Sequence, residues 1–593
     1  MPDSAQALLQ ARHDHAVAVV KAALESDSIF APIQPSDTLP LLKGCSAVWR
    51  RIVPLTNKNR VLEVGVTSEF PDEAPVAAVA DWEDLYLTNP HVLNGGLVCV
   101  IPNSAAIDSN DPAGLVKYVF RESEEILKGT SSNDFREEFS YYWGRRLTNG
   151  ERKILIVDPI EQLGNPFPAI FCKGYICVAS SVERLNRWAA NWTGSPSELK
   201  NEDLGVSIHL NSPLLPKEYP NSLTDLLSLA NLHDPTAARL INDHLVKSVG
   251  NGLALLVQDE AGGVALGGIV FNGLGLSQSV VLPGFRAGKA PADLILKAAA
   301  KSIASTEVAR ASVIRVDHRW IHSRGGDGRD LSKKSVLLIG CGSLGGYVAH
   351  LLSRAGIGRL TVTDNDLLSW ANVGRHILGA SSINRWKAEA MAEELKRELP
   401  HLEIVGIPKD WRDAFASDPQ LFTKHDLIVS TTADWRCERP LNALYRNTQM
   451  PPMLFGWLEP HAVAGHCLVV AKNGGCFECG VNTLGQFVHK VATFDEKTIS
   501  KEPGACTHYQ QYGPTALMPV ASMIASVTIE TLLTYPTDST LNSWISSEEH
   551  LQSVNAHISE AWSDEVVKSG YLRTFRKKWD KSANCAVCCQ TTI

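Results

Sequence analysis

The feature that most constrains this chain is a glycine-rich turn that follows an apolar segment at residues 336–345. Val336–Ile339 is a run of apolar, partly β-branched residues, which is typical of a buried parallel strand. Gly340, Gly342 and Gly345 follow in G-x-G-x-x-G spacing, which permits a tight turn and lets backbone N–H groups approach a phosphate at a helix N-terminus. The pattern predicts a nucleotide-binding β-α-β unit, and alone it fits NAD or FAD.

The residues after the second strand favour ATP over a dinucleotide. Asp364 ends the segment RLTVTD, where a ribose-binding acid is expected. An acid, an asparagine, an arginine and a lysine behind it suit a triphosphate better than a nicotinamide; these are Asp366, Asn372, Arg375 and Lys387. The next strand-like segment, DLIVSTTADW, ends near Asp434, which could hold Mg²⁺ between phosphate oxygens or act only as a helix N-cap. Together the set predicts adenylation with ATP and Mg²⁺.

These residues resemble the ubiquitin-activating superfamily, which includes the bacterial sulfur-carrier adenylating enzymes of thiamin and molybdopterin synthesis. The matching segments are GCGSLGG, AGIGRLTVTDND and ADWRCERPLN, and the last contains Asp434, Arg439 and Asn442. The resemblance implies a Rossmann-like domain, adenylation of a protein's C-terminal glycine and a homodimer. It also implies an arginine upstream of the first strand, for which Arg319 and Arg324 are both candidates. An ordinary surface arginine is the alternative for each of them.

The composition is that of a globular protein with several domains. The chain has 593 residues, of which 44% are hydrophobic and 20% charged, and its net charge is −8. These values allow sizeable cores and argue against nucleic acid as the main partner. The N-terminal segment does not resemble an export signal, and no run of about 20 apolar residues suggests a membrane span. We therefore expect a cytoplasmic enzyme with no membrane or direct nucleic-acid contact.

Thirteen cysteines in such a chain indicate metal binding or thiol chemistry rather than a disulfide framework. Two C-x-x-C pairs, Cys476 with Cys479 and Cys585 with Cys588, contain the four thiolates of a tetrahedral structural Zn²⁺ site. The activating superfamily has a split four-cysteine zinc site at these places, and free reduced thiols are the alternative. Cys589 has no assigned role.

Cys506 differs from these pairs because it lies in a polar segment, KEPGACTHYQQYGP, ahead of a long apolar helix. A thiol near a helix N-terminus would have a lowered pKa and could act as a nucleophile. The position matches the segment in which activating enzymes convert the adenylate to a thioester. His508 could assist, and a solvated histidine is the alternative. A small core residue is the alternative interpretation.

The N-terminal 150 residues have a different pattern, with strand-like segments and a predicted helix over Ala113–Leu127. The segment NPHVLNGGLVCV resembles the ubiquitin-conjugating fold, in which a His-Pro-Asn element precedes the active cysteine. Asn89-Pro90-His91 takes the place of that element, and Cys99 takes the place of the thiol. His91 replaces the asparagine that supports the oxyanion, so we expect it to donate to the oxyanion or to activate the thiol. A buried strand thiol is the alternative for Cys99.

The whole sequence predicts an α/β multidomain protein: residues 1–150 form an E2-like α+β domain, residues 151–310 an α/β linker domain, and residues 311–593 a Rossmann-like E1/ThiF adenylation domain with a zinc site. This combination most resembles the bacterial fusion enzymes of CBASS anti-phage operons. That resemblance implies a relay in which the C-terminal glycine of a target, the CD-NTase or a ubiquitin-like protein, is adenylated, bound to Cys506, passed to Cys99 and joined to a lysine or another amine.

Two rival functions stay open at this point. The first is a sulfur-carrier adenylyltransferase with an appended non-catalytic domain. The second is a scaffold or a redox Rossmann protein, which would bind NAD and show no ATP–pyrophosphate exchange.

Overall fold

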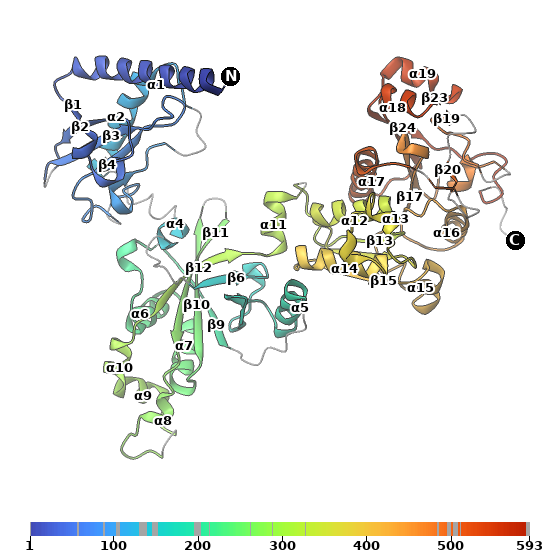
Figure 1. The fold of residues 1–593 in the computed structure, drawn as a ribbon. Coiled ribbons are helices and arrows are strands. Elements are labelled where there is room, and N and C mark those ends of the chain that lie inside the picture. The colour runs from blue at the N-terminus through green and yellow to red at the C-terminus, as the bar shows by residue number, and fades with distance from the viewer. Residues whose placement is uncertain are drawn as a thin grey trace. The chain divides into compact units, whose positions relative to one another are not determined.

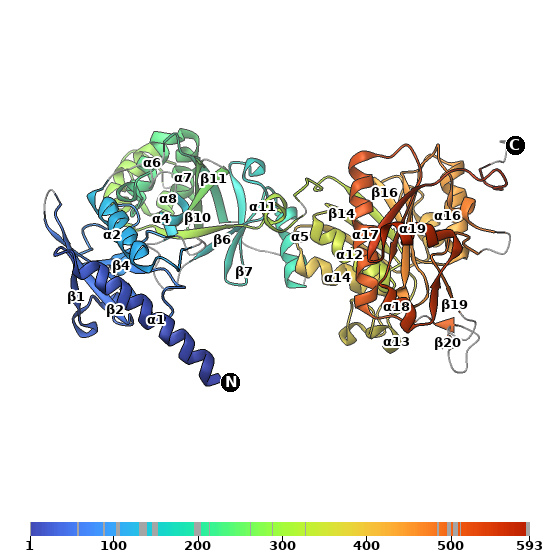
Figure 2. The same ribbon diagram turned by 90° about the horizontal axis from the view of Figure 1, so that it is seen from above.

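The computed structural model describes residues 2–55, 58–86, 89–101, 107–129, 139–144, 152–194, 203–212, 214–260, 263–286, 289–326, 328–482, 486–494, 500–501, 508–509 and 511–588. The chain divides into two compact units, whose elements are labelled in Figure 1 and seen from above in Figure 2. One unit comprises Met1–Ile154, Asn165–Ala169 and Asp203–Val313. The other comprises Leu155–Gly164, Ile170–Glu202 and Ile314–Ile593.

The N-terminal part is an antiparallel sheet with two long helices. The strands lie in the order β1 (Ala31–Ile33), β2 (Ala47–Val53), β3 (Arg60–Val66), β4 (Val76–Val79) and β5 (Leu97–Val98), and the helices are α1 (Pro2–Glu25) and α2 (Pro112–Lys128). Apolar side chains of both helices share one core with the sheet, including Val20, Leu62 and Phe120. Asp111 caps the N-terminus of α2, and Gly129 ends it in the left-handed conformation at φ 75°. This is the α+β arrangement that the sequence predicts.

The middle region is a closed barrel. Its strands follow the order β10 (Asn251–Glu260), β11 (Gly263–Asn272), β12 (Ala309–Arg315), β6 (Lys153–Ile156), β8 (Tyr175–Val178), β7 (Phe167–Cys172) and β9 (Asp203–His209). Before the first of these strands the chain forms α4 (Phe139–Gly144), and between them it forms α5 (Val182–Thr193), α6 (Leu223–His233), α7 (Pro235–Lys247), α8 (Leu276–Ser279), α9 (Ala292–Ala298) and α10 (Ala300–Ser305). Lys173 and Gly174, both with positive φ, join β7 to β8 as a tight hairpin turn.

The C-terminal part contains an eight-stranded sheet. Its order is β15 (Glu403–Ile407), β14 (Arg359–Thr363), β13 (Ser335–Ile339), β16 (Leu427–Ser430), β17 (Met453–Leu458), β18 (Ala464–Val470), β22 (Thr540–Ile545) and β24 (Arg573–Lys578). The first five strands are parallel, and the last three add antiparallel partners. Because β13 is flanked by β14 and β16, the order reverses there, and the carboxyl ends of these strands form the place where open α/β sheets bind ligands.

Helices cover both faces of the parallel strands, which explains why those strands are apolar without alternation. The helices of the C-terminal part are α11 (His318–Gly325), α12 (Ser343–Ala355), α13 (Trp370–Val373), α14 (Lys387–Glu398), α15 (Trp411–Ser417), α16 (Trp435–Asn447), α17 (Pro514–Thr534), α18 (Glu548–Ser553) and α19 (Glu560–Ser569). Two small sheets pair β19 (Ala492–Phe494) with β23 (Ala556–Ile558) and β20 (Ser500–Lys501) with β21 (His508–Tyr509).

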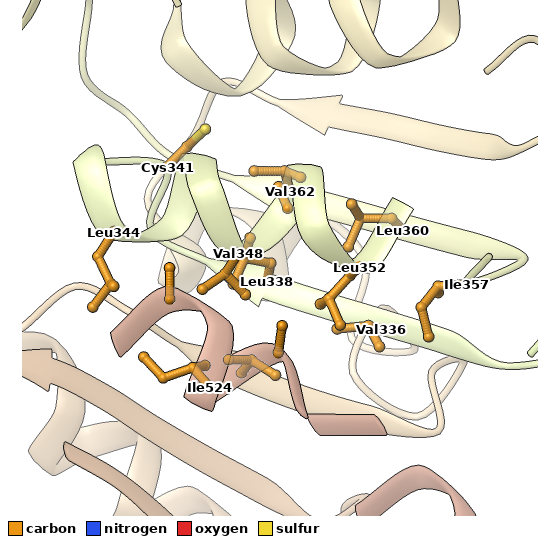
Figure 3. Packing of buried hydrophobic residues seen from close by; sticks show 14 of the residues in the cluster. Val336, Leu338, Cys341, Leu344, Val348, Leu352, Ile357, Leu360, Val362 and Ile524 are labelled. Atoms are coloured by element: carbon orange, nitrogen blue, oxygen red, sulfur yellow. The ribbon is translucent and has the colours of Figure 1, made fainter. Parts of the chain in front are cut away.

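Helix α12 packs between α17 and the parallel strands of the C-terminal sheet. Figure 3 shows Leu344, Val348 and Leu352 of α12 near Leu338 of β13 and Ile524 of α17, and all five side chains are buried. Among the described residues α17 is the one helix long and apolar enough to cross a membrane, and most of it is buried in this core. Its apolar sequence is therefore explained by packing.

Candidate adenylation and transfer sites

The glycine turn between β13 and α12 needs its glycines for two different reasons. Gly340 has φ 93°, a left-handed conformation that favours glycine, and a Cβ on Gly345 would lie 2.1 Å from the Gly340 carbonyl oxygen. A Cβ on Gly342 would meet nothing within 4 Å. Gly342 is the N-cap of α12, and among the described residues no side chain caps this helix, so its first N–H groups are available to a phosphate.

Asp364 fastens this turn to the end of β14. Its carboxylate accepts hydrogen bonds from the backbone N–H groups of Cys341 (2.6 Å) and Asp366 (2.8 Å). Burial raises the pKa of Asp364, because it disfavours the charged form more than these two bonds and the nearby Lys387 favour it. Lys387, the first residue of α14, is nearly buried and forms an ion pair with the exposed Asp366 (2.9 Å). The structure thus brings together the glycine turn, both acids and the lysine that the sequence predicts.

Asn372 and Arg375 lie on the segment between β14 and α14, and both have local partners. The Asn372 Oδ1 accepts bonds from the Ser369 N–H and hydroxyl, which makes it part of a capping box for α13. The Arg375 guanidinium donates to the Ala371 carbonyl (3.1 Å) and lies 5.9 Å from the ring centre of Tyr512. Their predicted roles toward phosphate stay predictions.

Asp434 follows β16 and begins α16. Its side chain caps the helix by accepting the Arg436 N–H (2.8 Å), and it also pairs with the exposed Arg436 guanidinium at 2.7 Å. These contacts with Arg436 lower the pKa of Asp434, so the carboxylate is ionised at neutral pH and able to bind a cation. Asp434 is therefore the N-cap of α16, as the alternative interpretation predicts. Its second carboxylate oxygen is bonded only to an exposed side chain.

Two buried residues that support this edge were not predicted from the sequence. Glu438 accepts the N–H of Ala433 (3.1 Å), a non-glycine residue at φ 52°, and burial raises the pKa of Glu438 to about 8. His376 donates from Nε2 to the Cys341 carbonyl (2.8 Å) and accepts the Leu378 N–H at Nδ1 (3.0 Å), so it is neutral. Burial lowers the pKa of His376 accordingly. In the sequence, the only indication of a role for Glu438 is that this acidic residue lies four positions after Asp434.

The two upstream arginines lie on α11 in different surroundings. Arg319 is 79% exposed and forms a long ion pair with Glu161 (4.0 Å). The Arg324 guanidinium lies 4.0 Å from the ring centre of Trp320. Neither contact identifies the arginine that would complete the ATP site.

The four cysteines of the two C-x-x-C pairs meet in one place. Their Sγ atoms all lie within 4.8 Å of one another, and the separations include 3.6 Å for Cys476 to Cys585 and 3.5 Å for Cys479 to Cys588. Four thiolates bound to Zn²⁺ at about 2.3 Å would be about 3.8 Å apart, so the arrangement fits a tetrahedral zinc site. Backbone N–H groups of Cys476 and Cys588 donate to the sulfurs of Cys479 and Cys585, as expected for thiolate ligands.

In the N-terminal part, the turn that carries Cys99 is held by backbone hydrogen bonds of His91. His91 has φ 65°, its carbonyl accepts the Cys99 N–H (2.9 Å), and its N–H donates to the Tyr142 hydroxyl (3.0 Å). Asn89 donates to the carbonyls of Ile126 (3.3 Å) and Leu127 (3.2 Å) at the end of α2. Cys99 is partly exposed, unlike a core thiol. Tyr142 is a further residue that the sequence analysis did not identify.

Gly95 and Gly96 in this turn both have positive φ, at 83° and 84°. A Cβ on Gly96, at φ 84°, would lie 2.4 Å from the Val79 carbonyl oxygen.

Cys506 and Cys589 lie outside the described residues. The backbone of β20 pairs with that of β21, with Ser500 opposite Tyr509 and Lys501 opposite His508.

Comparisons with known proteins identify both ends of the chain. The model of the ThiF family matches residues 320–563, and that of prokaryotic E2 family B matches residues 46–150. The ATP-dependent ubiquitin transferase-like protein Cap2 of Pseudomonas aeruginosa is 26% identical over 448 residues, which cover 71% of this chain and 74% of that protein. The Escherichia coli protein of the same name is 25% identical and covers 72% of this chain and 78% of its own length.

Two further similarities are more limited. The molybdopterin-synthase adenylyltransferase of Escherichia coli is 33% identical over 119 residues, which cover 20% of this chain and 47% of that enzyme. The crystal structure of Escherichia coli MccB with MccA covers 44% of this chain and 67% of its own, with 16% identity and a TM-score of 0.31, which is too low to inform function. The two family matches confirm the resemblance inferred from the motifs. The chain joins a prokaryotic E2-like domain to an E1-like domain of the ThiF family, and it is an E1/E2-like transferase.

Proposed function

We propose that this transferase links the C-terminal glycine of a target protein to an amine through an adenylate and two successive thioesters. The observation that carries the proposal is the presence, on one chain, of an ATP-type turn beside the ionised Asp434 and of a partly exposed Cys99 in an E2-like turn. An enzyme that only adenylates has no use for the second site.

In the first step the target carboxylate attacks the α-phosphorus of ATP, and pyrophosphate leaves. The uncapped N-terminus of α12 would receive phosphate, and Lys387 and Arg375 supply positive charge at the same edge of the sheet. Mg²⁺ would be held by Asp434 and would neutralise phosphate charge. Glu438 holds the loop that carries Asp434, so it acts on this step indirectly.

In the later steps the acyl group moves between thiols. The Cys506 thiolate attacks the acyl carbon of the adenylate, and AMP leaves. The Cys99 thiolate then attacks the Cys506 thioester and releases that thiol, and an amine displaces Cys99 to form an amide. His91 lies beside Cys99 and would donate to the oxyanion or take the proton of the thiol.

The Cap2 relatives suggest the setting of this reaction. We infer an anti-phage system of the CBASS type, in which the CD-NTase is the target and lysine side chains are acceptors. A ubiquitin-like protein ending in glycine is the other target of the same chemistry. We also infer a cytoplasmic homodimer formed through the adenylation domains.

The relay can be tested with the full-length chain and a purified CD-NTase as the proposed target. We expect ATP–pyrophosphate exchange that depends on the target, and target adducts that thiol reductants cleave. Cys99→Ala should leave an adduct at Cys506 and abolish the amide product. Cys506→Ala should abolish both adducts and retain exchange. No adduct at Cys99 with the CD-NTase or any ubiquitin-like protein from the same operon would reject the relay.

The sulfur-carrier alternative makes a different prediction. The similarity to a molybdopterin-synthase adenylyltransferase favours it for the adenylation domain alone. It predicts a thiocarboxylated product that Cys99→Ala does not affect, so mass spectrometry of the target C-terminus separates the two functions.

We also propose that the cysteine cluster holds a structural Zn²⁺ ion. The four sulfurs come from η8 (Phe477–Gly480) with its preceding residue and from the C-terminal segment, so the metal would fasten that segment to the domain. Elemental analysis should find one zinc per chain, and Cys588→Ser should lower both zinc content and thermal stability.

A further inference from the structure

Helix α4 carries three aromatic side chains that are almost completely buried, although it has only six residues. Phe139, Tyr142 and Trp143 are each at most 1% exposed. Close packing around these rings fixes the position of the short helix. A residue that binds one of its side chains is therefore held in a defined position too.

Phe139 and Trp143 fix the helix to β11 and β12. Their rings are 5.4 Å apart, and the Trp143 Nε1 donates to the Ala311 carbonyl (3.0 Å). A Cβ on Gly267 of β11 would lie 2.9 Å from the indole, so the strand makes room for Trp143 by having a glycine there. These contacts leave α4 little freedom to move.

Tyr142 makes contacts of another kind. Its ring packs against Tyr86 and Leu215, and its hydroxyl oxygen accepts the N–H of His91 at 3.0 Å. The carbonyl of His91 in turn accepts the N–H of Cys99 at 2.9 Å. A continuous path of hydrogen bonds therefore runs from the fixed helix through His91 to Cys99.

We propose that Tyr142 is a positioning residue for acyl transfer at Cys99. His91 has φ 65°, a conformation that non-glycine residues rarely adopt, and the bond from Tyr142 holds it there. In that conformation the His91 carbonyl accepts the Cys99 N–H and fixes the backbone of Cys99. Tyr142 acts through this backbone contact and has no assigned role at the reacting atoms. This inference rests on the proposed role of Cys99 as the second thioester site.

The test is Tyr142→Phe in the full-length chain, because this change removes one oxygen atom and retains the buried ring. We expect thioester loading of Cys99 to stay within about twofold of wild type and single-turnover transfer from Cys99 to an amine to fall about tenfold, the effect of one lost hydrogen bond. Exchange of the His91 amide hydrogen should become faster. Tyr118→Phe, which removes the same atom from a 42% exposed tyrosine on α2, is the matched control and should change none of these.

Each outcome decides the proposal. Transfer at the wild-type rate in Tyr142→Phe, or unchanged exchange of the His91 amide, would overturn it. A parallel fall in loading, transfer and melting temperature would also overturn it, because Tyr142 would then serve stability alone. If wild-type protein forms no thioester at Cys99, the proposed function fails instead, and measuring that first keeps the two failures apart.

Discussion

Two sites can be compared: the ATP edge, which comprises Gly340–Gly345, Asp364, Lys387, Asp434 and Glu438, and the Cys99 turn, which comprises residues 89–99. They are held together in different ways. At the ATP edge, a partly buried acid and a buried acid bind backbone N–H groups of the same motif: Asp364 binds Cys341, and Glu438 binds Ala433. At the Cys99 turn, support comes from helices outside the motif, because Asn89 binds the end of α2 and Tyr142 belongs to α4. The first site is thus built by its own sheet, and the second depends on elements further along the chain.

This difference has energetic consequences. Burying carboxyl groups at the ATP edge raises the pKa values of Asp364 and Glu438, so the edge should respond to pH. The Cys99 turn is held by neutral amide, hydroxyl and carbonyl groups, so it should respond to the loss of single hydrogen bonds.

The strongest test of the ATP edge is replacement of Asp434. Asp434→Ala should lower ATP–pyrophosphate exchange on the order of 100-fold or more, because it removes a charge that balances Mg²⁺ and phosphate. Asp434→Asn retains an N-cap acceptor and removes only the charge. We therefore expect Asp434→Asn to have nearly wild-type thermal stability and the activity of the alanine variant. Wild-type exchange in Asp434→Asn would mean that capping α16 is its whole role.

The glycine turn offers two substitutions that separate stability from binding. Gly345→Ala should lower the melting temperature and abolish exchange, because the Cβ would lie 2.1 Å from the Gly340 carbonyl. Gly342→Ala should melt like wild type, since its Cβ meets nothing within 4 Å, and should still weaken ATP binding by filling the space at the N-terminus of α12. Calorimetry of ATP binding checks this. Normal affinity in Gly342→Ala would place the phosphates elsewhere.

The sequence predicts the ATP edge well because its signals are local. The strand predicted at Val336–Ile339 is β13 (Ser335–Ile339), and Gly340, Asp364 and Lys387 meet as the order of strand, turn and helix requires. The spacing of two C-x-x-C pairs likewise predicts a four-sulfur cluster, although more than a hundred residues separate them.

The residues that sequence analysis missed depend on burial or on distant partners. Tyr142 is 51 positions from His91, and no period or spacing connects them. From the sequence, Glu438 cannot be distinguished from any other acidic residue in the first turn of a helix. Only the structure shows that it is buried. Asn372 illustrates the converse, because the sequence predicts a role toward phosphate for it, and the structure shows it in the capping box of a short helix.

The pH dependence of stability should be affected by Glu438. Its folded-state pKa is raised to about 8, so the folded protein holds this proton more tightly than the unfolded chain does. Its contribution to stability is complete below the unfolded pKa of about 4.3 and is lost as the pH rises toward 8. Glu438→Gln, which is neutral at every pH, should therefore flatten the fall in melting temperature between pH 5 and pH 8. Equal slopes for both proteins would show that Glu438 is ionised throughout this range.

The smallest effect is expected at the Cys99 turn, where Asn89 donates to two carbonyls at the C-terminus of α2. Asn89→Ala should lower the free energy of unfolding by about 1 kcal/mol through the loss of these bonds. Asn89→Asp has nearly the same shape, but it cannot donate, and its charge is unfavourable beside helix carbonyls. Chemical denaturation should rank the stabilities as wild type, alanine, then aspartate. Exchange at the ATP edge should be unchanged in both variants, because that site is built from its own sheet. If exchange fell together with stability, the two sites would share support, and the contrast between them would be wrong.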